Sequence, residues 1–319
     1  MAQILYPSPE NLELLAQKLV AGQLVAFPTE TVYGLGADAT HSKSVASIYQ
    51  AKGRPSFNPL IAHYASLEAA QQDAVFSTEA LAFAHAFWPG PLTLVLPKKA
   101  DSQVSNLATA GLNTIAVRIP SHPDALALLK KCNKPIVAPS ANPSGFLSPV
   151  TAQQVEKGLG HTIEWILDGG KTARGLESTI VDVTTSIPTI LRHGPITHAM
   201  LTKVISTTHE TNHTDALAPK SPGMLLQHYA PHCPLRLTID NPQEGEALLA
   251  FGPGLIPLGF ETVLNLSVTG NLQEAATNLF DYLHHLDDQP NIKKIAVMRI
   301  PNVDLGIAIN DKLRRAAHH

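Results

Sequence analysis

The chain has 319 residues, of which 44% are hydrophobic and 15% charged, with a formal net charge of −3. This length suffices for about two globular domains, and the composition excludes an intrinsically disordered protein. Two cysteines, Cys132 and Cys233, exclude a disulfide scaffold and a four-cysteine zinc ribbon, and the balanced charge excludes a domain that holds nucleic acid by bulk positive charge.

The first fifteen residues, MAQILYPSPENLELL, contain acids and prolines where a signal peptide would carry a basic patch and an apolar core. The most apolar late stretch, residues 247–260, is interrupted by Gly252, Pro253, Gly254 and Pro257, which argues against a membrane span. We therefore expect a cytoplasmic protein that does not engage a membrane.

The first two hundred residues alternate short apolar runs with helical patterns. Ser42 is the expected N-cap of the second helix, and Gly53 its stop. Several connections are too short for a parallel crossover, so we expect a mixed sheet. Helices are predicted at 11–21, 42–52, 77–87, 123–131, 151–158 and 196–206, and strands at 24–27, 60–63, 92–96, 114–119, 136–138 and 178–183.

Residues 207–222 are polar, lack periodicity and end in prolines, and this pattern predicts a linker. Beyond them the pattern predicts a small α/β domain of three layers. Its strands are expected at 235–239, 261–266 and 293–298, and its helices at 242–250, 272–286 and 305–317.

Four segments place polar or turn residues where predicted strands end, which is where α/β proteins bind ligands. Lys52 and Arg54 form a cation pair suited to a polyphosphate, although cations also complement the dipole at a helix end. Ser140 and Asn142 offer short hydrogen-bonding groups, as an ordinary turn would. The segments are 28–36 (PTETVYGLG), 52–60 (KGRPSFNPL), 136–145 (IVAPSANPSG) and 175–182 (GLESTIVD).

Two other groups of residues are poorer candidates. Glu30, Glu177 and Asp182 carry carboxylates, but their spacing matches no paired-carboxylate signature. His228, His232 and Cys233 resemble metal ligands, but Pro231 prevents a regular helix from aligning the histidines. We expect no metal held by protein side chains alone. Neither common nucleotide-binding glycine motif is present.

Together the four segments resemble the YrdC-like family, in the long two-domain form of its threonylcarbamoyl-AMP synthases. Residues 221–224 (SPGM) and 228–231 (HYAP) resemble the linker of that form. The implied fold class is α/β. It comprises a YrdC-like twisted mixed sheet with flanking helices at 1–206, an interdomain linker or lid at 207–233, and a smaller Rossmann-like three-layer α/β domain at 234–319.

The resemblance implies synthesis of L-threonylcarbamoyl-adenylate from L-threonine, bicarbonate and ATP, with release of pyrophosphate. This is a nucleotidyltransferase reaction, with Mg²⁺ bridging the triphosphate. The expected partners are threonylcarbamoyl-transfer enzymes, and tRNA is a further candidate because the adenosine beside its anticodon receives the group.

By motif position, the resemblance implies that Lys52 and Arg54 are catalytic. Arg118 would pair with the carboxylate of threonine, Ala138 would contribute through its backbone, and Tyr229 would belong to a lid over the nucleotide. The implied ATP site comprises Lys52, Arg54, Asn58, Thr114, Ser140, Ser148, Arg192 and Tyr229, and the implied L-threonine site comprises Thr31, His63, Arg118, Ala138 and Ser178.

Two alternatives stay open at the level of sequence. A non-catalytic RNA-binding module would use the concave face of a YrdC-like domain, but the first domain lacks the expected excess of positive charge. A hydrogenase-maturation carbamoyltransferase contains the same domain, but it also carries zinc-finger cysteines that two distant cysteines do not supply.

Overall fold

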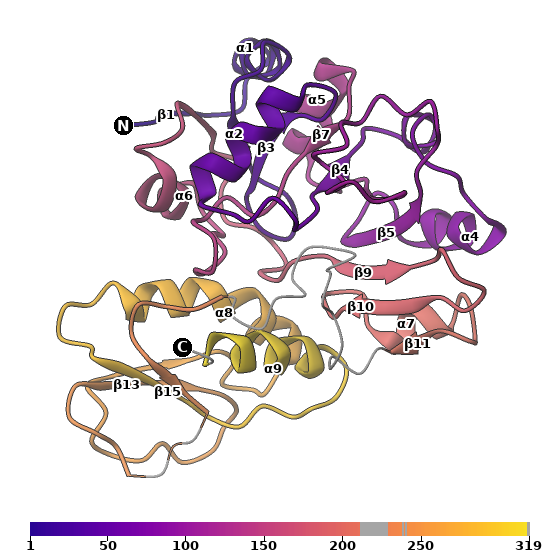
Figure 1. Ribbon diagram of the computed structural model, residues 1–319. Helices are drawn as coiled ribbons and strands as arrows, with labels where there is room; N and C mark the ends of the chain where they lie inside the picture. Colours follow the sequence, from indigo (N-terminus) through magenta and orange to yellow (C-terminus); the bar gives the residue numbers. More distant parts are fainter. Residues whose placement is uncertain (211–228, 238, 240, 318–319) are drawn as a thin grey trace.

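The computed structural model describes residues 1–210, 229–237, 239 and 241–317. These residues form two sheets, one of eleven strands and one of four, with helices packed against each. Figure 1 shows the two parts one above the other, with α8 (Leu272–Asp287) and α9 (Leu305–Ala316) between the small sheet and the large one.

The large sheet is mixed, with strand order β1-β8-β2-β3-β7-β4-β6-β5-β9-β10-β11. Its strands are β1 (Gln3–Leu5), β2 (Val25–Phe27), β3 (Gly34–Asp38), β4 (Ile61–His63), β5 (Leu92–Pro97), β6 (Thr114–Arg118), β7 (Ile136–Val137), β8 (Trp165–Leu167), β9 (Thr179–Asp182), β10 (Thr189–Arg192) and β11 (His209–Glu210). Its helices are α1 (Pro9–Val20), α2 (Ser42–Lys52), α3 (Leu67–Ala70), α4 (Thr78–Phe87), α5 (Pro123–Cys132), α6 (Ala152–Leu159) and α7 (His198–Thr202).

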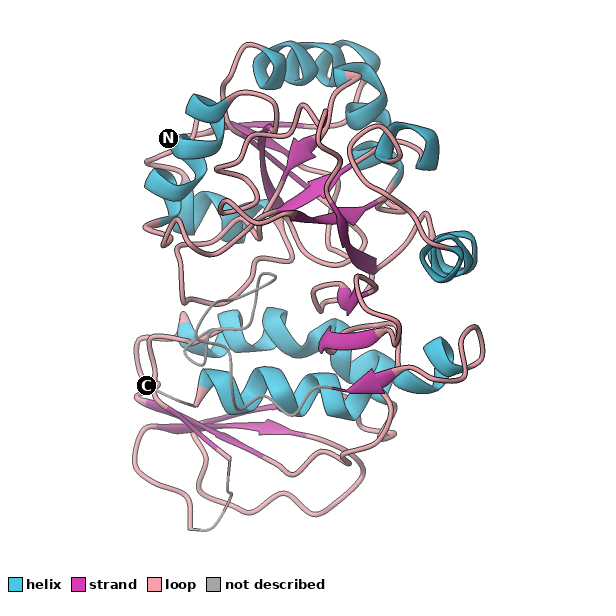
Figure 2. Ribbon diagram, turned by 45° about the vertical axis from the view of Figure 1, so that its right-hand side comes forward, coloured by secondary structure: helices cyan, strands magenta, loops and turns pink. Residues whose placement is uncertain are grey.

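Apolar residues on alternate sides of the strands give this sheet a core on each face. In β2, Val25 and Phe27 join the cluster under α1 and α5, whereas Ala26 joins the cluster under α2, α4 and α6. Side chains of successive strand residues point to opposite faces, so a fully apolar run is what a sheet covered on both faces requires. Figure 2 shows helices on both sides of these strands.

The small sheet is parallel throughout, with order β12-β15-β13-β14. Its strands are β12 (Leu235–Arg236), β13 (Glu246–Ala250), β14 (Thr262–Asn265) and β15 (Lys294–Val297). Ala247 and Leu249 of β13 face α8 and α9, and Leu248 and Ala250 join a smaller cluster on the other face. Both helices described for this part therefore cover the face toward the first domain (Figures 1 and 2).

The core under α8 and α9 continues into the first domain. Val32, Leu147, Val150 and Leu176 belong to the same buried cluster as the apolar residues of those helices. Tyr229 lies within it, fully buried, with its ring centroid 5.5 Å from that of Phe280. The two parts are thus packed on a shared apolar interior.

The two-domain α/β class and the large mixed sheet predicted from the sequence are confirmed. The predicted helix at 242–250 is wrong, because Glu246–Ala250 is the strand β13, buried on both faces of the small sheet.

The predicted N-cap of α2 is also wrong, because Ser42 is the first residue of that helix. His41 holds that position, and its Nδ1 contacts the Ser44 hydroxyl at 2.8 Å. Most of the predicted linker, with residues 221–224 and His228, lies outside the described residues.

Candidate active site

A small cavity of about 40 Å³ lies at one edge of the large sheet. The pairings of β4, β6, β5, β9 and β10 make β4, β6 and β10 run in the same direction, so their carboxyl ends meet at this edge. These ends carry His63, Arg118 and Arg192. The cavity is lined by these three residues together with Val32, Arg54, Ile61, Ala138, Pro139, Ser140 and Glu177.

Arg118 is held by the loop that follows β2. Its Nη2 donates to Glu30 Oε1 at 2.7 Å and to the Thr31 hydroxyl at 2.9 Å, and all three side chains are buried. The other oxygen of Glu30 accepts from the backbone N–H of Ser121 at 3.1 Å. Thr29 closes the loop by accepting from the N–H of Thr31. The guanidinium is thus fixed before any ligand arrives, and its Nε has no hydrogen-bond partner among the described residues.

Lys52 and Arg54 lie on either side of the end of α2. Gly53 ends that helix in the left-handed region (φ +59°), which lets the chain turn toward the cavity. Lys52 Nζ donates to the carbonyl of Ser140, at 2.6 Å, and to that of Asn142. Arg54 donates through Nε to the carbonyl of Asn58 at 3.4 Å and through Nη2 to that of Pro59 at 3.2 Å. Both cations are therefore oriented by backbone carbonyls of the neighbouring loops.

Burial acts on both of these cations. It lowers the pKa of Lys52 well below its usual value, and the nearby Arg54 adds to the effect. Burial also lowers the pKa of Arg54 to about 10, so the guanidinium stays charged at neutral pH. Buried cations are costly unless an anion compensates them, so this end of the cavity favours an anionic ligand.

The segment that enters β9 completes the opposite wall. Arg192 donates through Nε to the carbonyl of Ser178 and through Nη2 to its hydroxyl, both at 3.0 Å. The Ser178 hydroxyl also contacts that of Thr93 at 2.7 Å. Next to it, Glu177 accepts from the Ser148 hydroxyl through Oε1, and its Oε2 has no partner among the described residues.

His63 adds no charge to the cavity. Burial, reinforced by Arg118, lowers its pKa to about 3, so the imidazole is neutral at physiological pH. Its Nδ1 contacts the carbonyl of Ile61 at 3.1 Å. The basic side chains around the cavity are Lys52, Arg54, Arg118 and Arg192, and the acidic ones are Glu30 and Glu177. An excess of basic side chains suits ligands with phosphate and carboxylate groups.

The structure brings most of the sequence-predicted residues together. Arg54, His63, Arg118, Ala138, Ser140 and Arg192 line the cavity. Lys52, Asn58, Thr31, Ser178 and Ser148 are bonded to lining residues. Thr114 lies at the start of β6, at the opposite end of the strand from Arg118, and does not line the cavity. Tyr229 lies in the apolar interior between the domains. The roles given to these residues stay predictions.

Glu30 and Glu177 are the residues that the sequence reasoning set aside. Their spacing along the chain is uninformative because each pairs across a long range, Glu30 with Arg118 and Glu177 with Ser148. Their position in the sequence could have indicated a place at the site, because each lies directly before a predicted threonine-site residue in its motif. Asp182, grouped with them, lies at the far end of β9, where it accepts from Thr184.

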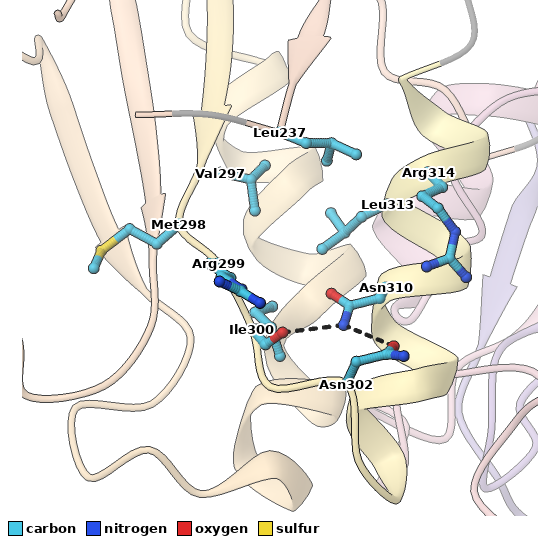
Figure 3. A pocket seen from close by; sticks show the side chains of 9 residues that line it. All are labelled: Leu237, Val297, Met298, Arg299, Ile300, Asn302, Asn310, Leu313 and Arg314. Atoms are coloured by element: carbon cyan, nitrogen blue, oxygen red, sulfur yellow. Dashed lines mark hydrogen bonds between the residues drawn. The ribbon is translucent and has the colours of Figure 1, made fainter. Parts of the chain in front are cut away.

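The rest of the described chain offers fewer candidate functional groups than this cavity. The described residues contain no group of three or more potential metal-ligating side chains. His232 contacts Asp287 at 2.8 Å, and the Cys233 thiol donates to the carbonyl of Ile292. None of the described helices is both long and apolar enough to cross a membrane. A pocket of about 270 Å³ in the second domain (Figure 3) includes none of the predicted site residues.

Comparison with known proteins gives consistent matches along the chain. Residues 17–194 match the Sua5/YciO/YrdC family, described as "Telomere recombination", and residues 196–318 match the family of the C-terminal domain of threonylcarbamoyl-AMP synthase. The threonylcarbamoyl-AMP synthase of Pyrococcus abyssi is 40% identical, over 96% of this chain and 94% of the relative. That of Bacillus subtilis is 39% identical, over 95% and 91%. The crystal structure of P. abyssi Sua5 complexed with L-threonine superposes with a TM-score of 0.91 at 36% identity, covering 99% of this chain and 97% of that one.

Proposed function

The chain belongs to the Sua5/YrdC family, in the two-domain form of its threonylcarbamoyl-AMP synthases, and we propose that its cavity joins L-threonine, bicarbonate and ATP into threonylcarbamoyl-adenylate with release of pyrophosphate. One observation carries this proposal. Arg118, a fixed arginine suited to a carboxylate, lines the same small cavity as Arg54, and Lys52 donates to the lining residue Ser140 to complete a buried cation pair suited to a triphosphate. The reaction places the product in tRNA modification and the enzyme in the nucleotidyltransferase class.

The threonine end of the cavity is formed by Arg118, Thr31, His63, Ala138 and Ser178. Arg118 is already oriented by Glu30, and its free Nε offers a donor to the substrate carboxylate. A charge-assisted bond from a fixed guanidinium is strong and directional. Neutral His63 and the hydroxyls of Thr31 and Ser178 suit the uncharged groups of the amino acid.

The nucleotide end is formed by Lys52, Arg54, Asn58, Ser140 and Arg192. The two cations beside α2 neutralise the triphosphate, and Asn58, whose buried Oδ1 has no partner among the described residues, supplies a polar group beside Arg54. Thr114, Ser148 and Tyr229 complete the proposed ATP site at a greater distance from the cavity.

The chemistry requires positioning more than a protein nucleophile. The amine of threonine attacks the carbon of bicarbonate, with loss of water, or that of CO₂, with loss of a proton. An oxygen of the resulting carbamate then attacks the α-phosphorus, so that pyrophosphate leaves. Phosphoryl-type transfer depends on alignment and on neutralisation of developing charge. Lys52 and Arg54 meet the second need, and this is the catalytic role proposed for them.

Mg²⁺ fits the residues present. It binds oxygen ligands and usually bridges phosphate groups with few protein contacts. Glu177 offers it a buried carboxylate oxygen without a partner among the described residues, at the wall of the cavity. When bound, the ion would neutralise triphosphate charge. Bicarbonate, threonylcarbamoyl-transfer enzymes, tRNA and a cytoplasmic location belong to the same proposal.

We propose further that residues 1–206 form the catalytic domain, 234–319 the second domain, and 207–233 a lid over the nucleotide. The lid would exclude water from a carbamate and a mixed anhydride that both hydrolyse readily. Bound ATP should then slow proteolysis within 207–233. A rate of cleavage unchanged by ATP would leave this segment a tether.

The test of the function is threonine-dependent release of pyrophosphate from ATP in bicarbonate buffer. Serine should replace threonine poorly, because one missing methyl is worth about 1–3 kcal/mol of discrimination. Pyrophosphate release that is independent of threonine, or RNA binding without any release, would contradict the proposal.

A further inference from the structure

The second domain contacts the walls of the cavity at three points. In α8, the Nε2 of His284 contacts the carbonyl of Ser148 at 3.2 Å. Also in α8, the backbone of Ala276 and Thr277 lies against Gly175. In α9, Lys312 Nζ donates to the carbonyl of His193 at 3.1 Å. Ser148 belongs to the proposed ATP site, His193 directly follows Arg192, and Gly175 lies two residues before Glu177 of the cavity lining.

Close backbone packing joins these contacts into one unit. A Cβ at Gly175, which has φ +68°, would lie 2.4 Å from the carbonyl oxygen of Ala276. A Cβ at Gly194 would lie 2.4 Å from the carbonyl oxygen of Glu177 and 2.5 Å from the nitrogen of Thr179. Both approaches are possible only for glycine. The segment that carries Glu177 is therefore packed between α8 on one side and Gly194 on the other.

Lys312 is the charged member of this contact. It is 1% exposed, although it lies on the terminal helix of the second domain. Its Nζ lies 5.1 Å from the ring centroid of Tyr229 and 3.6 Å from Asp311 Oδ2. Figure 1 shows α9 below the first domain, with β9 and β10 above it and to its right. A cation taken this far out of water costs several kcal/mol unless its partners compensate it.

Charged groups of both domains act on the pKa of Lys312. Burial lowers its pKa, Asp311 and Glu177 oppose that shift, and Arg192 and Arg315 reinforce it. Glu177 and Arg192 belong to the first domain and line the cavity. By contrast, the side chains of Arg118, Thr31 and Glu30 are hydrogen-bonded to one another, to the Thr29 hydroxyl and to the backbone N–H of Ser121, all within the first domain.

We propose that Lys312 is a positioning residue by which the second domain sets the affinity of the ATP site. It fixes the carbonyl of His193, and with it the preceding residue Arg192. Through the contact of Gly194, the same bond fixes the backbone carbonyl of Glu177. This inference rests on the function proposed above.

The experiment compares Lys312→Met with Arg314→Met. Methionine keeps the length of the lysine stem and removes the charge and the donor. Arg314 lies on the same helix but is exposed, and Figure 3 shows it at the pocket on the other side of α9, among residues of the second domain. Lys312→Arg retains charge and donor and serves as the conservative variant.

Lys312→Met should raise the KM for ATP at least about tenfold, the effect expected for loss of a buried charge-assisted bond. The KM for threonine should change less than about threefold, because Arg118 keeps its own partners. Lys312→Arg should recover most of the ATP affinity, and Arg314→Met should match the wild type.

An unchanged KM for ATP in folded Lys312→Met would overturn the inference, as would an equal rise in both KM values. Circular dichroism establishes folding. If the methionine variant does not fold, Lys312→Gln is measured in its place against the same criteria. Calorimetric titration with ATP decides the inference even if pyrophosphate release fails in the wild type, an outcome that would contradict the proposed function alone.

Discussion

Both domains have a pocket near the carboxyl ends of parallel strands, but they differ in how they hold charge. In the first domain, β6 and β10 end in Arg118 and Arg192, both buried. In the second, β15 is followed by Met298 and the exposed Arg299, which line the pocket in Figure 3. Buried charge costs several kcal/mol unless it is paired. The buried charges therefore distinguish the proposed active site from a pocket that strand geometry alone produces.

The buried charges of the second domain follow the same logic. Asp311, Lys312 and Arg315 of α9 are all at most 6% exposed, and Lys312 donates to the first domain rather than into its own domain's pocket. The buried charges of the second domain, which lower stability unless they are paired, thus lie at its boundary with the proposed active site. The predictions below test this difference between the domains.

The largest effect is expected for Arg118→Ala. The substitution leaves the Glu30 carboxylate buried without its cation, which costs about 3–5 kcal/mol of unfolding free energy. Urea denaturation measures the loss, and use of threonine should disappear. In Arg118→Met with Glu30→Leu, apolar replacement of both partners should restore most of the stability but none of the activity. A stable, active Arg118→Ala protein would remove the basis of the comparison.

Lys52→Ala should reduce adenylate formation by one to three orders of magnitude, equivalent to about 1.5–4 kcal/mol of transition-state stabilisation. Lys43, exposed near the start of the same helix α2, provides the matched control. Lys43→Ala should release pyrophosphate at the wild-type rate. Equal rates for the two variants would show that burial of Lys52 serves stability only.

His63 should make stability depend on pH. Its pKa is about 3 in the folded protein and about 6.5 when unfolded. Between these values only the unfolded chain binds the proton, and this binding lowers the free energy of unfolding. The effect is absent above about pH 6.5 and grows as the pH falls toward 3. At pH 5 the loss is about 2 kcal/mol. Urea denaturation at pH 7.5 and pH 5 should show a smaller difference in His63→Gln. The same difference in both proteins would assign the effect to other groups.

The smallest effect is expected for Arg299→Ala in the second domain. An exposed arginine at a pocket rim contributes within about 0.5 kcal/mol of unfolding free energy. Pyrophosphate release should also stay at the wild-type rate. A loss of activity in this variant would show that exposed charge at the second pocket takes part in the reaction, and the contrast between the two pockets would fail.

Local sequence signals predicted the elements whose stability is local. The helices at 123–131 and 272–286 have apolar periodicity and polar residues at their starts, and α5 and α8 form there. The strand β13 was missed because EALLA has helical composition, and burial at the centre of a parallel sheet overrides that preference. The strand β3 was missed because two of its five residues are glycines.

The site followed a similar division. Motif residues such as Arg54, Ser140 and Arg192 were predicted from short segments and do line the cavity. The carboxylate of Glu30 was set aside because its partner lies 88 positions away in sequence. No sequence pattern pointed to a role for Lys312, because its hydrogen-bond acceptor is a backbone carbonyl 119 positions away in the sequence. Pairings of this range become visible only once the sheet and the helices are assembled.

The contact between α9 and His193 also orders events during synthesis of the protein. Ribosomes add roughly 5–20 residues per second. More than a hundred residues separate Gly194 from Leu305, where α9 begins, so a nascent chain spends several seconds with Glu177 and Arg192 made but α9 not yet translated. Over that interval the large sheet can form, whereas the wall of the proposed nucleotide site lacks its contact with α9. If Lys312 positions that wall as we propose, completion of the proposed catalytic centre is tied to translation of a distant part of the message.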